Sequence, residues 1–551
     1  MRKEESVLIR VPIVLIAALV CGVLAVAPAA GVPGETPKRG GTLVVGRPSF
    51  AEPACLNPFT CTNSGDPALT QVLEGAFEVG PDLVPRPDLV SDVTTGRNPP
   101  SLTYHIRPEA RWSDGVPVTA RDFQFTQEAF AAHEDPDGFY ANVRSIRVLN
   151  AKTFRVELGQ PLAAWRYLYS LVLPRHALAG QDITKVWSDR VDNPKTGQPI
   201  GNGPFLLSRL ERGKQITLVR NPRYWGPHVA YLDRLVQRFM TEDPHDPLRP
   251  VREQEVDFGF TLGGFAPVSA DEARDIRKLP GWRVAAWPSA GMEHFTLRVG
   301  PGGHPALRLK LVRQALAYGI DRVAIAREIQ QDVPASIRKP LDSTVFLPQE
   351  PFYQPNWSRY RYDVARSRRL LEQAGCRRGS GGIYECAGER LRLRFVTSAG
   401  NSVRERIVTL AAAHLRNVGV EVVPAYAPLN VFLDQILPNG DFDVALFNWG
   451  GVYGGVVVWP DVLCGNEQNF AGYCSRLVTR DAGQNLIGSL AARARVLNHL
   501  DTKLAKAAPV LPLVQPAIRA FFRSNLHGVS FGGSNFEIQE DTENWWLASE
   551  R

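Results

Sequence analysis

The residues best suited to chemistry lie at the end of an apolar run, Asp441–Trp449, which reads DFDVALFNW. The run is followed directly by GGVYGGVVVW, in which glycines are interspersed with aromatic and β-branched residues. Glycines let a backbone approach a bound molecule closely, and aromatic rings offer it flat apolar surfaces. This combination favours non-covalent capture of a small molecule. The alternative is a glycine-rich loop whose aromatic side chains only pack in the core.

Catalytic chemistry has little support in the sequence. The chain has no His-Glu-x-x-His zinc motif, no phosphate-binding Walker loop and no Gly-x-Gly-x-x-Gly dinucleotide fingerprint. The adjacent Glu293 and His294 could act as an acid–base pair, but such a pair more often has a structural or ligand-contacting role. We therefore predict no catalytic residue, no metal site and no cofactor.

An alternation of strand and helix patterns determines where the apolar run would lie. Between residues 391 and 449 the chain reads as strand (LRLRFV), helix (403–418), strand (VEVVPAY), short helix (431–437) and strand (DFDVALFNW). That order is typical of a parallel α/β layer. In open parallel sheets a ligand binds just outside the carboxyl ends of the strands, and this rule points to Trp449.

Local signals elsewhere mark turns and helix starts. The stretch YHIRPEARWSDGVPVTARDFQF predicts a half-buried strand, a tight turn at Asp114-Gly115 and a helix that begins near Thr119. Asp122 lies three residues after Thr119, which is the spacing of a capping box.

The carboxyl half contains further helix boundaries. Asp321 and Asp363 each precede a helical pattern and predict amino-terminal caps. Gly375 and Gly419 follow the last periodic residues of two helices and predict their carboxyl ends. These signals predict the helices but give no functional information by themselves.

Charge and length bound the class of protein. The 551-residue chain has 63 basic and 56 acidic residues, a net charge of +7. This excess is spread along the chain, whereas a nucleic-acid-binding surface would concentrate it on one face. We therefore expect no nucleic-acid partner. The length predicts roughly three to four domains.

The amino terminus has the order of a secretory signal. A charged start (MRKEESVLIR) precedes an apolar run (VPIVLIAALVCGVLAV), and small residues follow at Ala27 and Ala29. We predict a signal peptide over residues 1–30, a Pro/Gly linker over 31–40, and an extracytoplasmic protein. Two alternatives stay open: the apolar run could remain as a membrane anchor, or Cys21 could be lipidated.

The cysteines agree with export. Six of the seven form three pairs of near neighbours in sequence. In an oxidising compartment such pairs are typical of disulfides that close local loops. A metal site is disfavoured because none of the pairs has Cys-x-x-Cys spacing. We predict three sequential bridges: Cys55–Cys61, Cys376–Cys386 and Cys464–Cys474.

Five segments occur in an order that resembles a known family. They are RPEARWSDGVPVTARDFQFT, GNGPFLLSR with ITLVRNPRYW, RLKLVRQALAYGIDR, RRLLEQAG and GDFDVALFNW. Together they resemble the extracytoplasmic solute-binding proteins of ABC importers, in the dipeptide/oligopeptide-binding class (family 5). The resemblance covers the chain from about Gly40 to its carboxyl end. It implies a two-lobed α/β fold of the periplasmic-binding-protein type, with an extra inserted domain.

The resemblance also implies three hinge-linked domains. Domain I would be discontinuous, with residues 40–75, 185–291 and 504–551. Domain II would be an insertion of residues 76–184, and domain III would be the α/β lobe of residues 292–503. A small solute would be enclosed between domains I and III by hinge closure, and a membrane permease would recognise the closed form. We expect the protein itself to be a monomer.

One position departs from the peptide-binding members of this class. Their ammonium-binding aspartate follows the strand-end tryptophan by three residues, where this chain has Val452. Either another acid, such as Asp461 or Glu293, holds the peptide ammonium, or the solute is not a simple peptide. We favour a peptide and keep a non-peptide solute, such as an oligosaccharide, as the alternative. A secreted hydrolase and a cell-surface interaction protein are less favoured.

The strand-end argument and the resemblance together predict the ligand contacts. The main group is Asn448, Trp449, Gly450, Gly451 and Tyr453. The weaker candidates, each of which could equally be a packing residue, are Asn63 and Ser64, after the first predicted disulfide loop, and Glu293 and His294, where domains I and III would cross.

Overall fold

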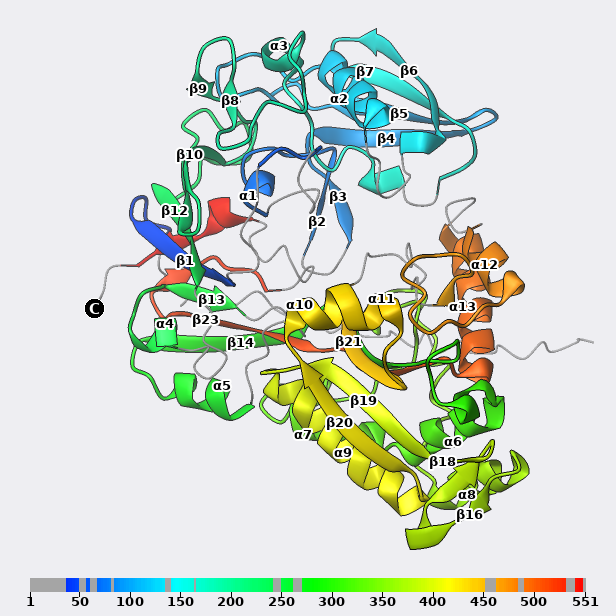
Figure 1. Ribbon diagram of the computed structural model, residues 1–551. Coiled ribbons are helices and arrows are strands. Elements are labelled where there is room, and N and C mark those ends of the chain that lie inside the picture. Colours follow the sequence, from blue (N-terminus) through cyan, green and yellow to red (C-terminus); the bar gives the residue numbers. More distant parts are fainter. Residues whose placement is uncertain are drawn as a thin grey trace, which may run out of the picture.

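The computed structural model describes residues 36–48, 56–59, 67–80, 84–133, 140–162, 165–240, 249–260, 270–450, 462–483, 490–531 and 541–548. Within these residues the chain forms two lobes (Figure 1). The first lobe contains a seven-stranded sheet and an inserted four-stranded sheet, and the second lobe contains a five-stranded sheet. The predicted fold class, a two-lobed α/β protein with an inserted domain, is confirmed.

The seven-stranded sheet of the first lobe is assembled from distant parts of the chain. Its order is β10-β11-β12-β1-β13-β23-β14. The strands are β1 (Thr42–Pro48), β10 (Phe205–Glu211), β11 (Gln215–Arg220), β12 (Arg234–Met240), β13 (Phe258–Phe260), β14 (Trp282–Pro288) and β23 (Ala517–Arg523). Small elements beside it are α1 (Pro67–Thr70), the hairpin β2 (Phe77–Val79) and β3 (Pro85–Pro87), α4 (Arg249–Arg252), α5 (Ala270–Arg277), β24 (Leu526–His527), η8 (Thr542–Asn544) and β25 (Trp546–Leu547).

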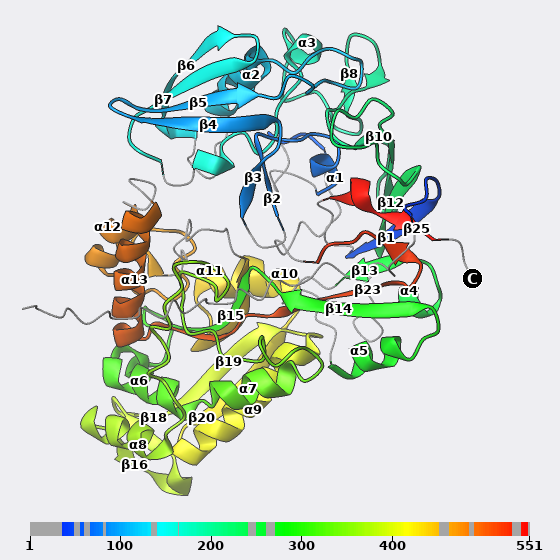
Figure 2. The ribbon, with the colours of Figure 1, turned by 180° about the vertical axis from the view of Figure 1, so that it is seen from behind.

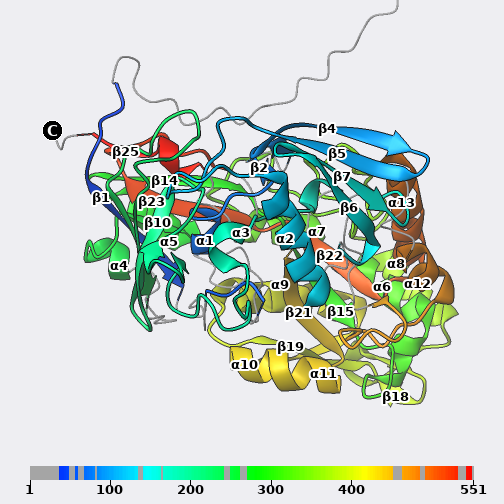
Figure 3. The same cartoon turned by 90° about the horizontal axis from the view of Figure 1, so that it is seen from above.

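The inserted sheet lies at the top of the molecule in Figure 1 and faces the viewer in Figure 3. Its order is β4-β5-β7-β6, all antiparallel. The sheet and the elements that accompany it are β4 (Val90–Arg97), β5 (Pro100–Ile106), α2 (Ala120–Ala132), η2 (Tyr140–Asn142), β6 (Val143–Asn150), β7 (Thr153–Leu158), η3 (Trp165–Tyr167) and α3 (Arg175–Leu178). β8 (Asp192–Asn193) and β9 (Gln198–Pro199) form a separate two-stranded sheet.

The turn and helix start predicted between the strand β5 and the helix α2 are confirmed. The Asp114 carboxylate accepts a hydrogen bond from the Val116 N–H at 3.1 Å, which closes the turn. The Asp122 carboxylate accepts bonds from the N–H and the hydroxyl of Thr119 at 2.7 and 2.8 Å, so the side chain reaches back over the first turn of α2 as a capping box requires.

The second lobe is built around the sheet β20-β19-β21-β15-β22. Its strands are β15 (Gly291–Leu297), β19 (Arg392–Ser398), β20 (Glu421–Ala427), β21 (Val444–Gly450) and β22 (Val510–Val514). Its helices are η4 (Pro305–Arg308), α6 (Lys310–Gly319), α7 (Arg322–Ile329), α8 (Val364–Gln373), α9 (Ser402–Val418), α10 (Leu429–Val431), the π-helical turn η6 (Phe432–Ile436), α11 (Leu437–Asn439), α12 (Arg476–Gly483) and α13 (Leu490–Ala507). A small three-stranded sheet, with η5 (Ser380–Gly382), contains β16 (Arg377–Arg378), β17 (Tyr384–Cys386) and β18 (Glu389–Arg390).

The predicted parallel layer is the core of this lobe. β19 runs parallel to both β20 and β21, with Phe395 beside Val444 in the register. β15 is antiparallel to β21 and β22, so the sheet is mixed rather than purely parallel. The predicted caps are present, since Asp321 and Asp363 each accept a backbone N–H in the first turn of α7 and α8.

Two short segments connect the lobes. β14 of the first lobe continues into β15 of the second through residues 289–290, and β22 continues into β23 through residues 515–516. The two segments are bonded to each other, because the Ser289 N–H donates to the Pro516 carbonyl at 2.8 Å and the Gln515 amide donates to the Ser289 carbonyl. Figure 2 shows this junction from behind, with β14 and β23 leading into the second lobe.

The strand pairing of the sheets moves one domain boundary from its predicted position, the start of the carboxyl-terminal part of domain I. The prediction assigned residues 504–551 to domain I, but β22 pairs with β15 in the second lobe. Leu504 and Ala505, at the end of α13, pack in the core of the same lobe. The carboxyl-terminal crossing therefore falls at Gln515. Sequence patterns did not reveal this because β22 is an apolar strand that either sheet could accept.

Two of the three predicted disulfides are in the structure, Cys376–Cys386 and Cys464–Cys474. Cys55 and Cys61 lie outside the described residues, as do Cys21 and the predicted leader. In the described part of the chain, no helix combines the length and the apolar character needed to span a bilayer.

Candidate ligand-binding site

The strand end at Trp449 lies at the edge of the second-lobe sheet that meets the inter-lobe junction. β19, β20 and β21 all end at this edge, and β15 begins there with Gly291 paired to Gly450. Gly291 directly follows residues 289–290, the first of the two segments that connect the lobes. The end of β21 is therefore held next to these connecting segments. This is the place at which an open parallel sheet leaves room for a ligand.

One face of this edge is aromatic. Phe447 and Trp449 alternate onto the same face of β21, and His294 of β15 packs edge-on against Phe447 with ring centroids 4.5 Å apart. Phe470, from the loop before α12, stacks parallel to Trp449 at 6.1 Å. His294 is fully buried, whereas Trp449 is partly exposed. Of these rings, Trp449 therefore offers accessible surface to a ligand.

The opposite face of the same edge carries a buried ion pair. The Arg404 guanidinium of α9 contacts both carboxylate oxygens of Glu293, at 2.9 to 3.3 Å, and both side chains are nearly inaccessible to solvent. Asn448, which is opposite Glu293 in the register, turns its amide to the Trp449 carbonyl and the Met292 N–H. The Glu293 carboxylate is thus neutralised by Arg404.

The adjacent Glu293 and His294 consequently face different surroundings. Successive side chains of a strand point to opposite faces of the sheet. Glu293 faces α9 and Arg404, while His294 faces Phe447 and the aromatic side. They do not form the acid–base pair considered from the sequence.

The aromatic edge makes an apolar contact with the first lobe. Ala290, Met292, Leu341 and Leu347 form a small buried cluster next to the junction. Four partly buried side chains pack against it, Val79 and Tyr167 from the first lobe and Tyr353 and Trp449 from the second. Trp449 therefore belongs to the surface across which the two lobes meet.

Carboxylates gather in the first lobe beside this contact. Glu78 precedes Val79 on β2, and burial, together with nearby carboxylates, holds the pKa values of Glu74 and Asp88 well above their usual range. Burial also raises the pKa of Glu543 to about 7. Glu74, Asp88 and Glu543 are half-buried as residues, but one Glu74 carboxyl oxygen is inaccessible to solvent and the other accepts a hydrogen bond from the Tyr224 hydroxyl. This side of the junction is consequently rich in acidic groups that resist ionisation.

A buried ion pair also links the lobes. Asp332, which follows α7 in the second lobe, accepts hydrogen bonds from Arg519 of β23 in the first lobe at 2.6 and 2.8 Å. The Arg277 guanidinium of α5 lies 3.9 Å from the same carboxylate. The Asp332 side chain has no exposed surface. The contact fixes the two lobes to each other close to the crossing at Gln515.

Family comparisons agree with this architecture. Residues 84–469 match the family described as bacterial extracellular solute-binding proteins, family 5 Middle. This chain belongs to that family. As a family 5 solute-binding protein it is placed among binding proteins rather than enzymes, and among proteins that act outside the cytoplasm.

Relatives and solved structures extend the likeness over most of the chain. The oligopeptide-binding protein OppA of Mycobacterium tuberculosis (strain ATCC 25618 / H37Rv) is 28% identical over 477 residues, 84% of this chain and 77% of that protein. The periplasmic EDTA-binding protein EppA superimposes with a TM-score of 0.82 and 22% identity, covering 94% of this chain and 98% of that one. The oligopeptide-binding protein AppA of Bacillus subtilis, solved with a nonapeptide, gives a TM-score of 0.69 and 20% identity, covering 93% and 100%. These two structures share the fold of the family 5 protein.

The structure brings only part of the predicted site together. Asn448, Trp449 and Gly450 end β21 as expected. Glu293 and His294 lie on opposite faces of β15. Four predicted contacts fall outside the described residues, Asn63, Ser64, Gly451 and Tyr453, as do Val452 and the candidate acid Asp461. Sequence reasoning missed Phe470 and Arg404. The only signal for Phe470 was its place inside the Cys464–Cys474 loop, and nothing local marked Arg404.

One short motif could suggest a hydrolase, but the described residues provide no base for its serine. Residues 528–532 read Gly-Val-Ser-Phe-Gly, the spacing of a nucleophile elbow. The Ser530 hydroxyl donates directly to the Asp541 carboxylate. A nucleophilic serine instead needs a base, usually histidine, within hydrogen-bonding reach of its hydroxyl. In the part of the chain that the structure describes, no group of three or more His, Cys, Asp or Glu side chains could hold a metal ion.

Proposed function

We propose that this family 5 protein is the solute-binding component of an ABC importer. It captures a small solute between its two lobes at the Trp449 edge and presents the closed form to a membrane permease. The observation that carries the proposal is the small cluster beside the two connecting segments, against which Trp449 of the second lobe and Val79 and Tyr167 of the first lobe all pack. A ligand bound there would contact both lobes at once, so that its binding energy would favour the closed arrangement.

A peptide is the favoured solute. OppA and AppA, which each align with most of this chain, are named as oligopeptide-binding proteins. The ammonium anchor expected three residues after Trp449 is replaced by Val452, and Glu293 is neutralised by Arg404. The first-lobe carboxyl groups beside Val79 offer a different anchor, because a peptide ammonium bound next to them would lower their raised pKa values and favour their charged form.

A non-peptide solute is the second candidate. The absence of an acid at Val452 favours it, because a charge-assisted hydrogen bond contributes about 1.5–3 kcal/mol and would be lost at that position. The fold of the EDTA-binding protein EppA, with its TM-score of 0.82, shows that this architecture also serves a small polyanionic ligand. An oligosaccharide or a chelate would need no ammonium anchor.

A thermal-shift screen tests the proposal. A ligand at 100 times its Kd stabilises the folded protein by about 2.7 kcal/mol, which raises its melting temperature. Synthetic di- to octapeptides, oligosaccharides and EDTA chelates are the probes, and a response to peptides alone supports the favoured solute. The absence of any response across all three classes would contradict the proposal.

Trp449 provides the local test. Trp449→Ala is expected to abolish the ligand-induced shift while changing the ligand-free melting temperature by only a few degrees, because the ring is partly exposed. Tyr362→Ala removes another partly exposed aromatic ring of the same lobe, and the ligand-induced shift should stay unchanged. Unchanged affinity in Trp449→Ala would remove this strand end from the site.

Export, anchoring and the monomeric state belong to the same proposal. Cleavage of the leader after Ala29 or Ala30, lipidation at Cys21 and retention of the apolar run give three different masses for the mature chain. Intact-mass measurement of protein from the native cell envelope distinguishes them, and light scattering of the mature protein tests the monomer.

A further inference from the structure

The loop that the Cys464–Cys474 disulfide closes carries a ring of the aromatic edge. Phe470 lies within this loop, is 9% exposed, and packs with Phe447 and Trp449. The planes of Phe470 and Trp449 differ by only 1°. A ring that belongs to the disulfide loop therefore lies parallel to the Trp449 indole, in the cluster against which Trp449 packs.

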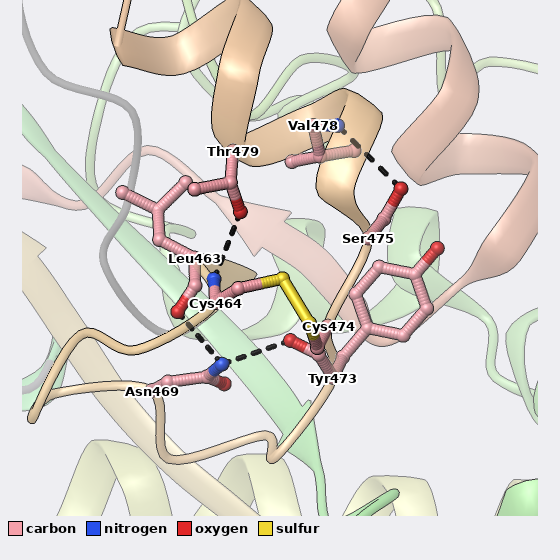
Figure 4. Close-up of a disulfide and its surroundings, with 8 residues drawn as sticks. All are labelled: Leu463, Cys464, Asn469, Tyr473, Cys474, Ser475, Val478 and Thr479. Atoms are coloured by element: carbon pink, nitrogen blue, oxygen red, sulfur yellow. Dashed lines mark hydrogen bonds between the residues drawn. A yellow bond between two sulfur atoms is a disulfide. The ribbon is translucent and has the colours of Figure 1, made fainter.

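The loop is held in one shape by hydrogen bonds at its base. Figure 4 shows the Asn469 amide inside the loop, donating to the Leu463 carbonyl at 2.9 Å and to the Tyr473 carbonyl at 2.8 Å. The Cys464 N–H donates to the Thr479 hydroxyl of α12 at 2.9 Å. These bonds join the two ends of the loop on either side of the disulfide. The conformation of the loop therefore depends on keeping those ends together.

The tip of the loop is docked on the sheet. The Arg298 guanidinium donates to the Phe470 carbonyl at 2.8 Å, and the Val299 N–H donates to the Ala471 carbonyl at 2.7 Å. Arg298 and Val299 directly follow β15. The phenyl ring itself packs in the cluster that contains Phe447 and Phe432. Phe470 is thus fixed from its backbone and from its side chain.

We propose that the Cys464–Cys474 loop is a positioning element for the binding site, in which Phe470 sets the orientation of the Trp449 ring. The inference rests on the proposed function, because it assigns Trp449 to the ligand. Phe470 is a positioning residue, since it acts through Trp449. The disulfide keeps the loop ends together and thereby keeps Phe470 stacked.

The second disulfide provides a matched control. Cys376–Cys386 has the same sequence separation of 10 and lies in the same lobe. It closes the small sheet β16–β18 and packs with Tyr384 and Leu391, in a different cluster from Phe470 and Trp449. Loops of equal length constrain the unfolded chain equally, so removing either bridge should lower stability by a similar amount.

The experiment compares C464S/C474S with C376S/C386S in the full mature chain. Protein labelled with 5-fluorotryptophan gives a fluorine resonance for Trp449, which is assigned with Trp449→Phe. We expect this resonance to shift or broaden in C464S/C474S and to stay in place in C376S/C386S. Phe470→Leu keeps the disulfide and should move the resonance in the same way, which covers the case in which C464S/C474S does not fold. An unmoved Trp449 resonance in Phe470→Leu would overturn the proposal.

Affinity for the di- to octapeptide mixture supplies the functional readout. C464S/C474S and Phe470→Leu should bind it roughly 2- to 12-fold more weakly than the wild type, the range that one aromatic pair contributes. C376S/C386S should bind it as the wild type does. Equal affinity in all variants would refute the positioning role. If the wild-type protein did not bind the peptide mixture, the peptide assignment would be refuted instead. The fluorine resonance would then still decide the role of Phe470.

Discussion

Replacing Glu293 tests whether this residue is a structural partner or a ligand contact. Glu293→Gln removes one charge and leaves Arg404, which is buried, without its counter-ion. The closest contact of the pair is 2.9 Å. Two unit charges at about 3 Å attract each other by roughly 6 kcal/mol at an effective dielectric constant of about 20. Part of this is offset by the cost of burying the charges, and breaking buried pairs destabilises proteins by about 3–5 kcal/mol.

The same helix offers a matched control. Arg406 of α9 pairs with Glu328 at the surface, where the side chains are 52% and 37% exposed. Glu328→Gln breaks this pair and should cost no more than about 1 kcal/mol. Because both substitutions change Glu to Gln beside an arginine of α9, the difference between them isolates the effect of burial.

The assay is urea denaturation of the ligand-free protein, with the free energy taken from the midpoint and slope of the transition. We expect a loss of about 3–5 kcal/mol in Glu293→Gln. The double variant Glu293→Leu/Arg404→Met should recover most of it, because an apolar pair leaves no uncompensated charge. If Glu293→Gln were as mild as Glu328→Gln but abolished solute binding, the reasoning would be refuted and Glu293 would be a ligand contact.

Two further predictions follow from the buried charges. Burial raises the pKa of Asp541 to about 8 from its ordinary 3.8, so between these pH values the folded chain keeps a proton that the unfolded chain has released, and stability falls as pH rises. Asp541→Asn should reduce the slope of the free energy of unfolding against pH by up to about 1.4 kcal/mol per pH unit. Thermal unfolding between pH 5 and pH 8 measures this slope, and an unchanged slope would contradict the prediction. Asp332→Asn breaks the inter-lobe pair with Arg519 and should lower the free energy of unfolding by about 3–5 kcal/mol, whereas the exposed Asp275→Asn should change it by less than about 1 kcal/mol. Equal effects of these two substitutions would show that the inter-lobe pair is not stabilising.

Much of the fold could be predicted from local sequence. The Asp122 carboxylate returns to Thr119, and Asp321 caps α7, because a cap depends on residues three positions apart. The end of α9 is set by Gly419, whose φ of 103° lies in the left-handed region that only glycine adopts readily. Hydrophobic periodicity then distinguished the strands from the helices of the second lobe, and the disulfides at Cys376 and Cys464 follow from near neighbours in sequence.

The partners of the site were beyond such reasoning. Arg404 lies 111 positions from Glu293 and meets it only because α9 packs on the face of the sheet to which Glu293 points. The carboxylates of Glu74 and Glu543 influence each other from opposite ends of the chain. Local patterns carry no information on such pairs, because each depends on how separate elements pack.

The sequence by itself therefore determined the elements, their order and the strand end at Trp449, since these depend on spacing over a few residues. Only the tertiary structure decided that Glu293 is neutralised by Arg404, that Phe470 lies parallel to Trp449, and that the edge meets the first lobe. The physical reason is that charge neutralisation and ring stacking require contact in space. In this chain the first two contacts join separate segments of the second lobe, and the small cluster at the junction adds side chains of the first lobe.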